Sequence, residues 1–300
     1  MRRRNGGVDR IDRGRYVRQL LHAARQAGLA AVLVLSVGAL PSAGAAAGPP
    51  RPGDPPDKQT AGITVPPDDP AITAGATEYP GITGPLLGYL AAPKGGDVYP
   101  GILVIHDRQG LNEHFKDIVR RLAKAGYVAL AVDLTSRQGG TEALGDAAKI
   151  DAALGSLAPQ QILEDLNASV RYLESRPVVA KTRIGAVGFG LGGSVLWLVL
   201  TSNPDIKAAV AISGVVPSPR VVSNLTAGVL TIFGENDRHD DQGIAEFDTA
   251  MKNAGLPFVV KLEPKAGRDF FNDTTTRYVP QAAKDAWGMT LDWLSQHLTG

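Results

Sequence analysis

The sequence predicts an α/β fold, a doubly wound and mostly parallel sheet with helices on both faces. Short β-rich runs alternate with longer helical patterns, which is typical of parallel strands joined by crossover helices. The β-rich runs are predominantly apolar, which indicates strands buried on both faces. A chain of 300 residues with 44% hydrophobic content suits one sizeable globular domain with some additional sequence.

Seven strands and three helices can be placed from these patterns. The strands expected are Leu86 to Ala91, Gly101 to Ile105, Val128 to Val132, Ile184 to Gly188, Ala208 to Ile212, Val229 to Phe233 and Phe258 to Leu262. Asn112 can cap a helix that runs to Ala125. Apolar residues at helical spacing predict two more helices, through Ile162, Leu166, Val170 and Leu173 and through Trp287, Leu291, Leu294 and Leu298.

The domain organisation follows from composition. Residues 1–47 are expected to be a signal peptide or N-terminal anchor, residues 48–72 a Pro-rich linker, and residues 73–300 the folded domain. Eight of the 31 basic residues but only two of the 30 acidic residues lie in residues 1–25, which leaves 23 basic against 28 acidic residues in the remainder. That acidic remainder gives no indication of a nucleic-acid partner.

The N-terminal segment predicts export, to a secreted or cell-envelope location. A basic region precedes the apolar run from Leu29 to Leu40, and small residues through Ala43-Gly44-Ala45 fit a signal-peptide cleavage site. The alternative is an uncleaved membrane tether through residues 26–47, because this uncharged run is long enough to span a bilayer. We favour cleavage. The chain has no cysteine, which excludes a lipidated cysteine anchor, disulfides and cysteine catalysis.

Ligands of doubly wound sheets bind at the carboxyl ends of the strands, so the loops beginning at His106, Gly190, Gly234 and Ala266 are the candidate site. The loop at Gly190 lies in Gly188-Phe189-Gly190-Leu191-Gly192-Gly193, which has the glycine spacing of the nucleophile elbow of α/β-hydrolases. Such an elbow presents a Ser or Cys side chain above the sheet. Here the central residue is Gly190, which offers no nucleophile.

The four loops and their flanking strands resemble the dienelactone hydrolase family of the α/β-hydrolase fold. The segments that carry the resemblance are Tyr99 to Asp107, Gly110 to Asn112, Gly126 to Leu134, Gly185 to Gly193, Gly234 to Asp237 and Ala266 to Asp273, and they occur in the family's order. The resemblance implies a hydrolase of esters and lactones with a Cys-His-Asp triad, or Ser in relatives, and no metal or organic cofactor.

Two of the three triad positions are substituted. The resemblance assigns the acid position to Asp237, the nucleophile position to Gly190 and the histidine position to Arg268. A guanidinium stays protonated near neutral pH and cannot act as a general base, but it can bind a carboxylate. We therefore expect a salt bridge between Arg268 and Asp237, with Asp269 as a competing partner.

The oxyanion apparatus is expected to survive, because it uses backbone donors. These are the N–H groups of Leu191 and Arg108. Asp107 occupies the position of a family glutamate that interacts with the nucleophile. The rim is expected to be polar, through Asp107, Arg108, Glu113, Arg137, Asp237 and Arg268.

Relocated catalytic groups are the alternative to a lost triad. Ser213 ends a predicted strand and could act with His239, or Asp237 could activate a water; a solvated loop position for His239 and a backbone-satisfying role for Ser213 are the simpler interpretations. Ser194 is expected to point into packing. His106 is interpreted as structural, His114 as a surface helix residue and His297 as a terminal one.

Three functional hypotheses result. The first is an exported member of the dienelactone hydrolase lineage that has lost triad chemistry and retains a pocket near Leu191 and Arg268 for a small carboxylate or ester. The second is an active ester or lactone hydrolase that uses a relocated nucleophile or an activated water. The third is a non-catalytic cell-envelope binding domain.

Overall fold

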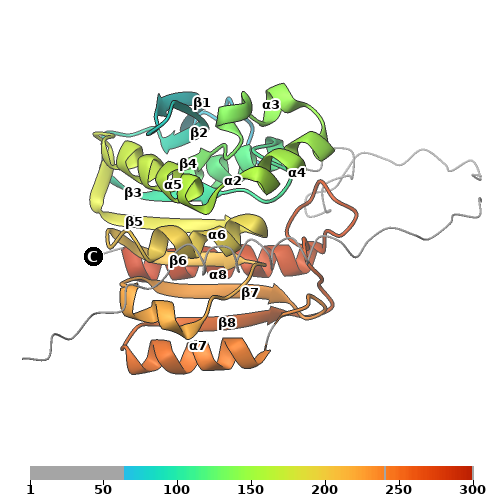
Figure 1. Ribbon diagram of the computed structural model, residues 1–300. Helices are drawn as coiled ribbons and strands as arrows, with labels where there is room; N and C mark the ends of the chain where they lie inside the picture. Colours follow the sequence, from blue (N-terminus) through green and yellow to red (C-terminus); the bar gives the residue numbers. More distant parts are fainter. Residues whose placement is uncertain (1–63, 240, 299–300) are drawn as a thin grey trace, which may run out of the picture.

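A computed structural model of the chain describes residues 64–239 and 241–298, which form one layered α/β domain (Figure 1). One sheet of eight strands in the order β1-β2-β4-β3-β5-β6-β7-β8 lies at its centre. The α/β fold with helices on both faces of a mostly parallel sheet is therefore confirmed. The predicted signal or anchor and most of the predicted linker lie outside the described residues.

The parallel part of the sheet runs from β4 to β8. Its strands are β3 (Tyr99–Ile105), β4 (Val128–Val132), β5 (Val179–Phe189), β6 (Ile206–Ile212), β7 (Gly228–Gly234) and β8 (Phe258–Glu263). All six were expected, with ends that differ by a few residues. Every residue of β4 and β7 is buried, as their unbroken apolar sequences predict.

An antiparallel pair completes one edge of the sheet. β2 (Pro85–Pro93) pairs antiparallel with β4, and β1 (Ile72–Pro80) pairs antiparallel with β2. The prediction lacked β1, because its sequence contains Thr, Gly and Glu, and only Ile72 and Tyr79 of this strand are buried. Such an edge strand gives a weaker apolar signal than the central strands.

Two sets of helices cover the two faces of the sheet. α5 (Pro159–Glu174) and α6 (Leu191–Leu200) pack on one face, and α2 (Glu113–Lys124) and α8 (Pro280–Leu298) pack on the other. The remaining elements are η1 (Ser136–Gln138), α3 (Thr141–Leu144), α4 (Ala147–Ser156), η2 (Pro219–Asn224) and α7 (Asp241–Asn253).

The expected bounds of α2 and the expected buried face of α5 agree with the structure, whereas the buried face of α8 differs in part. Asn112 caps α2, since its Oδ1 accepts from the N–H of Phe115 at 3.4 Å, and Ala125 is the C-cap. The four residues that predicted α5 are buried or nearly so on one face. In α8 the buried stripe is rotated, because Ala286, Thr290 and Trp293 are buried while Trp287 and Leu291 are only partly covered.

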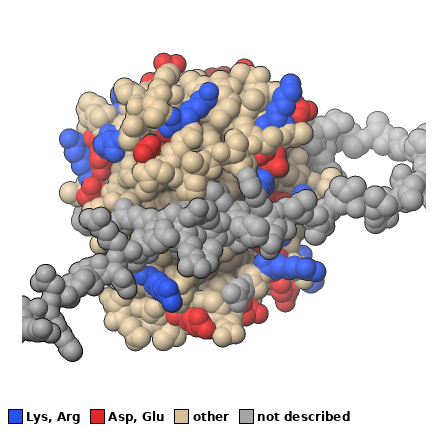
Figure 2. All heavy atoms as spheres, in the orientation of Figure 1, with Lys and Arg blue, Asp and Glu red and all other residues tan. Residues whose placement is uncertain are grey.

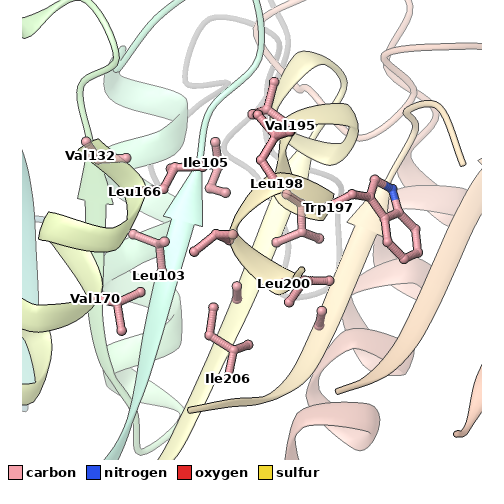
Figure 3. Packing of buried hydrophobic residues seen from close by; sticks show 14 of the residues in the cluster. Leu103, Ile105, Val132, Leu166, Val170, Val195, Trp197, Leu198, Leu200 and Ile206 are labelled. Carbon is pink, nitrogen blue, oxygen red and sulfur yellow. The ribbon is translucent and has the colours of Figure 1, made fainter. Parts of the chain in front are cut away.

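Each face of the sheet has its own hydrophobic core. Figure 3 shows Leu103 and Ile105 of β3 packed between Leu166 and Val170 of α5 and Val195 and Leu198 of α6. Alternate residues of the same strand, Ile102 and Val104, belong to the second core under α2 and α8. The two cores hold the ends of the central strands in fixed positions, which is a requirement for a precise site.

The packed chain begins before residue 73, where the linker was expected to end. Val65 is 5% exposed, and its N–H donates to Asp117 Oδ1 of α2 at 2.8 Å. The buried Arg120 donates from Nε to the Val65 carbonyl at 2.5 Å. Residues 64–72 thus pack along α2 before the chain enters β1.

The surface drawn in Figure 2 carries Lys and Arg side chains interspersed with Asp and Glu among uncharged residues. Among the described helices, none has the length and apolar character needed to cross a membrane.

The strand order places a topological switch point between β3 and β5. From β3 the chain moves to β4 on one side, and β5 then lies on the other side of β3. Loops that leave neighbouring strands in opposite directions open a crevice at their carboxyl ends. Asp107 follows β3 and Gly190 follows β5, so the expected site lies at this crevice.

Candidate functional site

Gly190 has the backbone geometry of an elbow. Its φ of 51° and ψ of −107° end β5 and begin α6, and its N–H donates to the carbonyl of Ile212 at 2.9 Å. An L-residue adopts this region at a cost, which glycine avoids. A Cβ placed at residue 190 would lie 3.3 Å from Cβ of Asp107, so a small side chain there would point toward the crevice and meet Asp107.

The turn at Gly190 also brings the backbone of α6 very close to the backbone of β3. A Cβ on Gly192 would lie 2.1 Å from the carbonyl oxygen of Ile105, closer than any real contact. Helix α6 therefore touches the end of β3 directly. The N-terminus of α6, which begins at Leu191, therefore lies next to Ile105 and His106, directly before the loop of Asp107 and Arg108 where an oxyanion hole was expected.

The salt bridge expected between Arg268 and Asp237 is present. Nε of Arg268 lies 3.1 Å from Oδ1 of Asp237, and the Asp237 side chain is 5% exposed. Burial raises the pKa of Asp237, although the charge and hydrogen bond of Arg268 act in the opposite direction. Asp269 does not compete for Arg268; its carboxylate instead lies 3.3 Å from Nη1 of Arg277.

A cavity of about 270 Å³, including its mouth, lies beside Gly190. Its lining combines an aromatic wall with a few polar side chains: Asp107, His114, Phe115, Phe189, Gly190, Ile212, Ser213, Asp269, Phe271 and Asn272.

Asp107 is the buried carboxyl of this cavity. Its side chain accepts from the N–H of Gln109 at 2.7 Å and contacts Nδ2 of Asn272 at 3.5 Å. Burial raises the pKa of Asp107 to about 6, and the nearby Asp269 adds to the effect. Asp107 is therefore an ionisable group whose charge changes in the mildly acidic range.

Ser213 lines the cavity in a strained conformation. Its φ is 50°, a region that non-glycine residues rarely occupy, and the residue is 3% exposed. Its Oγ is buried and has no hydrogen-bond partner among the described residues. The expected role of this hydroxyl in satisfying backbone groups is therefore wrong.

His114 is buried, and its assignment to the helix surface is wrong. It is 1% exposed on the inner side of α2, and Nδ1 lies 2.7 Å from Oδ1 of Asp273. Burial lowers the pKa of His114, although Asp273 acts against this shift. Nε2 is buried without a hydrogen-bond partner in the described part of the chain. The residue lines the same cavity as Ser213.

The structure does not bring His239 to Ser213. Nδ1 of His239 contacts the carbonyl of Asp237 at 2.8 Å, Nε2 lies 2.9 Å from Asp241, and the ring stacks on Phe233. The described residues that line the cavity do not include His239 or Asp237. His239 is thus held within its own loop and is not the solvated side chain expected for it.

Two other sequence interpretations are confirmed. His106 is fully buried and structural, because Nε2 accepts from the N–H of Leu134 at 3.1 Å and Nδ1 contacts the carbonyl of Asp107 at 2.7 Å. Ser194 points into packing, where its Oγ accepts from the N–H of Val215 and donates to the carbonyl of Gly190.

Most of the expected rim charges are engaged elsewhere. Arg108 contacts Asp151, Glu113 pairs with Arg120, and Arg137 pairs with Asp165. Of the six predicted rim residues, Asp107 alone is among the described residues that line the cavity. The described residues also contain no cluster of three or more His, Cys, Asp or Glu side chains that could hold a metal ion.

Sequence reasoning missed the pair of His114 and Asp273. The partners are 159 residues apart, so no local pattern joins them. A partial signal was available, because His114, Ile118 and Leu122 recur at intervals of four, which places all three on one helical face.

Comparison with known proteins agrees with the fold and the loops. Residues 86–298 match the family described as "Dienelactone hydrolase family". The chain is 34% identical over 250 residues to "Putative carboxymethylenebutenolidase" of Methylorubrum extorquens, which covers 78% of this chain and 84% of that protein. It is 33% identical over 226 residues to "Probable 2-oxo-3-(5-oxofuran-2-ylidene)propanoate lactonase" of Bradyrhizobium sp. That alignment covers 71% of this chain and 90% of the lactonase.

A solved structure gives the same result. The crystal structure of "Putative Dienelactone Hydrolase from Klebsiella pneumoniae subsp. pneumoniae" is similar with a TM-score of 0.68 and 30% identity, covering 76% of this chain and all of that one. The family contains hydrolases of small-molecule esters and lactones, and the α/β-hydrolase architecture extends over the whole described domain. This chain belongs to the dienelactone hydrolase family.

Proposed function

We propose that this protein binds a small neutral ester or lactone in the cavity beside Gly190 and does not hydrolyse it through the triad positions of its family. The observation that carries the proposal is the pair of substitutions at those positions. Gly190 keeps the elbow backbone without a nucleophilic atom, and Arg268 forms an ion pair with Asp237. Such an ion pair is a structural clamp and supplies no proton acceptor.

The size of the expected loss supports this proposal. Disabling a serine triad costs roughly a million-fold in turnover, about 8 kcal/mol, while oxyanion stabilisation and binding retain about a thousandfold over water. The N-terminus of α6 lies against the end of β3. This position supports the proposal that backbone amides there bind the carbonyl oxygen of the ligand.

The lining of the cavity favours a neutral ligand over a carboxylate. Asp107 and Asp269 both line it, whereas Arg268 is turned toward Asp237. A carboxylate ligand would meet two acidic groups and, among the described lining residues, no Lys or Arg, which costs free energy in a buried site. Phe115, Phe189 and Phe271 offer an apolar wall for a flat ring.

A thermal-shift titration at pH 7 tests the proposal. A neutral aromatic lactone such as coumarin should raise the melting temperature of wild type, because a ligand that binds only the native state stabilises it. The matched control is o-coumarate, the ring-opened carboxylate, which should give a smaller shift. Ordinary turnover of phenyl acetate by wild type, or stabilisation by the carboxylate alone, would contradict the proposal.

We also propose that the protein is exported and acts in the cell envelope or outside the cell. The basic, apolar and small-residue succession of residues 1–47 supports this location. Fractionation of the producing cells, with the N-terminal mass of the product, tests it. A full-length chain in the cytoplasmic fraction would contradict export, and a full-length chain in the membrane fraction would favour the tether over cleavage.

A further inference from the structure

Strand β8 forms one edge of the sheet. Among the described strands it pairs only with β7, and Figure 1 shows it as the last strand of the sheet, beyond β7. An unpaired edge presents backbone N–H and C=O groups that can bond to a further strand. β8 is therefore a place where a second chain can extend the sheet.

The hydrogen bonds to β7 show which residues of β8 face the open edge. The N–H groups of Val229 and Glu235 donate to the carbonyls of Pro257 and Glu263, both at 2.9 Å. Because backbone groups alternate in direction along a strand, the odd-numbered residues of β8 bond to β7. The even-numbered residues, Leu262 among them, direct their N–H and C=O groups to the open edge.

Leu262 is the exposed apolar residue of this edge. Its exposed fraction is 51%, whereas Phe258, on the same face of β8, is 9% exposed and packs on Phe247 of α7. Helix α7 thus covers the start of β8 and leaves its end open. The opposite edge strand, β1, contains no exposed large hydrophobic side chain. An apolar residue at an unpaired edge favours contact with another strand.

The charged residues on either side of Leu262 have no charged partner. Neither Lys261 nor Glu263 belongs to an ion pair of the described residues. Lys261 is exposed, but Glu263 is only 4% exposed. Burial raises the pKa of Glu263, and the negative charge of Asp285 adds to this shift. A cation placed beside Glu263 would stabilise its ionised form.

A second copy of the chain supplies that cation in one register. In an antiparallel pair with a twofold axis at Leu262, Lys261 of each copy lies opposite Glu263 of the second copy, and the two leucines face each other. An axis at Lys261 would instead place two lysines opposite each other. An axis at Val260 would place Lys261 opposite Val259. Only the axis at Leu262 pairs the opposite charges directly.

We propose that the free edge of β8 is a dimerisation surface, at which two copies of this chain pair antiparallel about Leu262 and join their sheets. Backbone hydrogen bonds between the two Leu262 residues, contact of their side chains and two ion pairs of Lys261 with Glu263 hold the dimer together. Pro264 follows β8 and has no N–H, so it ends the ladder. The contact is short, which predicts a reversible dimer with a dissociation constant of roughly 1–100 µM.

Sedimentation velocity of the purified protein over a range of about 1–500 µM tests the dimer. Wild type should show a concentration-dependent equilibrium of monomer and dimer. Lys261→Glu should raise the dissociation constant by about 10-fold or more, because two attractive pairs become repulsive. Leu262→Asp should also weaken the dimer. Lys181→Glu and Ile82→Asp, at exposed residues outside β8, are the matched controls and should leave the equilibrium unchanged.

Cysteine cross-linking tests the register, since the chain has no cysteine of its own. Leu262→Cys should give a disulfide-linked dimer under mild oxidation, because the Cα atoms of a hydrogen-bonded antiparallel pair lie about 5.5 Å apart, within the range of disulfides. Lys261→Cys should cross-link much less, since the axis places residue 261 opposite residue 263. Ile82→Cys is the control for exposure and should remain monomeric.

The outcomes decide the proposal independently of any ligand in the cavity. A wild-type protein that stays monomeric over the whole concentration range would overturn it, even if the edge binds another peptide. A dimer that both Lys261→Glu and Leu262→Asp leave unchanged has its interface elsewhere and would also overturn it. Cross-linking through Lys261→Cys but not through Leu262→Cys would contradict the register. Both positions are exposed in the monomer, so these variants should keep the wild-type melting temperature.

Discussion

The two ends of the loop from Ala266 to Asp273 use their charged side chains in opposite ways. At its start, Arg268 binds Asp237 and closes the position where the family has a histidine. At its end, Asp273 contacts Nδ1 of His114, while Nε2 of that histidine is buried without a hydrogen-bond partner among the described residues. In the ion pair, the two charged groups satisfy each other. In the contact of Asp273 with a neutral histidine, only one of the two ring nitrogens is hydrogen-bonded. The same loop thus combines a satisfied ion pair with a contact to a histidine that keeps one unsatisfied nitrogen.

The largest expected effect comes from restoring a nucleophile at residue 190 and a histidine at residue 268. Gly190→Ser with Arg268→His should raise phenyl acetate hydrolysis by about a thousandfold over wild type, because a nucleophile and a base would then adjoin the oxyanion site that we propose. The serine Cβ must displace Asp107 by a few tenths of an ångström. Each single variant is the control and should stay near wild type. Equal rates for the double variant and Gly190→Ser would show that Asp237 and residue 268 no longer act as a pair.

The next effect concerns the cavity wall and depends on pH. Because the folded pKa of Asp107 is raised to about 6, its charge destabilises the native state once the pH passes its unfolded value near 4. The destabilisation should be absent below pH 4 and complete above pH 6, reaching about 2–3 kcal/mol. Asp107→Asn should remove this dependence and raise stability at pH 7. Urea unfolding of wild type and Asp107→Asn from pH 4 to pH 7 measures the free energy of unfolding of each protein. If the difference between the two proteins does not change with pH, the burial effect is refuted.

A smaller effect separates the two partners of the clamp. Arg268→Ala leaves a buried Asp237 without a partner and should cost about 1–2 kcal/mol, because an unsatisfied buried carboxylate is unfavourable. Asp237→Asn should cost less, since the Arg268 side chain is 29% exposed and can reach solvent. Chemical unfolding at pH 7 checks the order. A larger loss of stability for Asp237→Asn than for Arg268→Ala would contradict this order. It would mean that an unpaired Arg268 costs more free energy than an unpaired Asp237.

The smallest effect is a gain in stability. Ser213→Gly should stabilise the protein by about 1 kcal/mol, because glycine adopts a positive φ without strain and an unsatisfied hydroxyl is removed. Lys265→Gly is the control for strain alone, since Lys265 has a φ of 60°. Equal gains in both variants would show that the Ser213 hydroxyl carries no cost of its own.

The sequence predicted the central part of the fold because its signals there are local. Unbroken apolar runs such as Val128 to Val132 fix the buried strands, and Asn112 fixes the start of α2. The edge strand from Ile72 to Pro80 escaped detection, since most of its residues are exposed or half-buried and its apolar run is interrupted. The family resemblance supplied the order of the loops.

In the candidate site, too, features fixed by local sequence could be predicted, whereas contacts between distant segments could not. Gly190 and the partnership of Arg268 with Asp237 could be inferred, because motif positions fix which loops meet. The contact of His114 with Asp273 could not, since it joins a helix and a loop 159 residues apart and depends on side-chain directions. The strain at Ser213 was equally hidden, because a serine at a strand end normally adopts an extended backbone.

The most direct test of the central claim, that the elbow scaffold is present without its attacking atom, is the intact mass of the wild-type domain after incubation with a fluorophosphonate. The expected result is an unmodified protein, under conditions in which the variant with Gly190→Ser and Arg268→His gains one adduct. An adduct on the wild-type protein, at Ser213 or at any other side chain, would contradict the account.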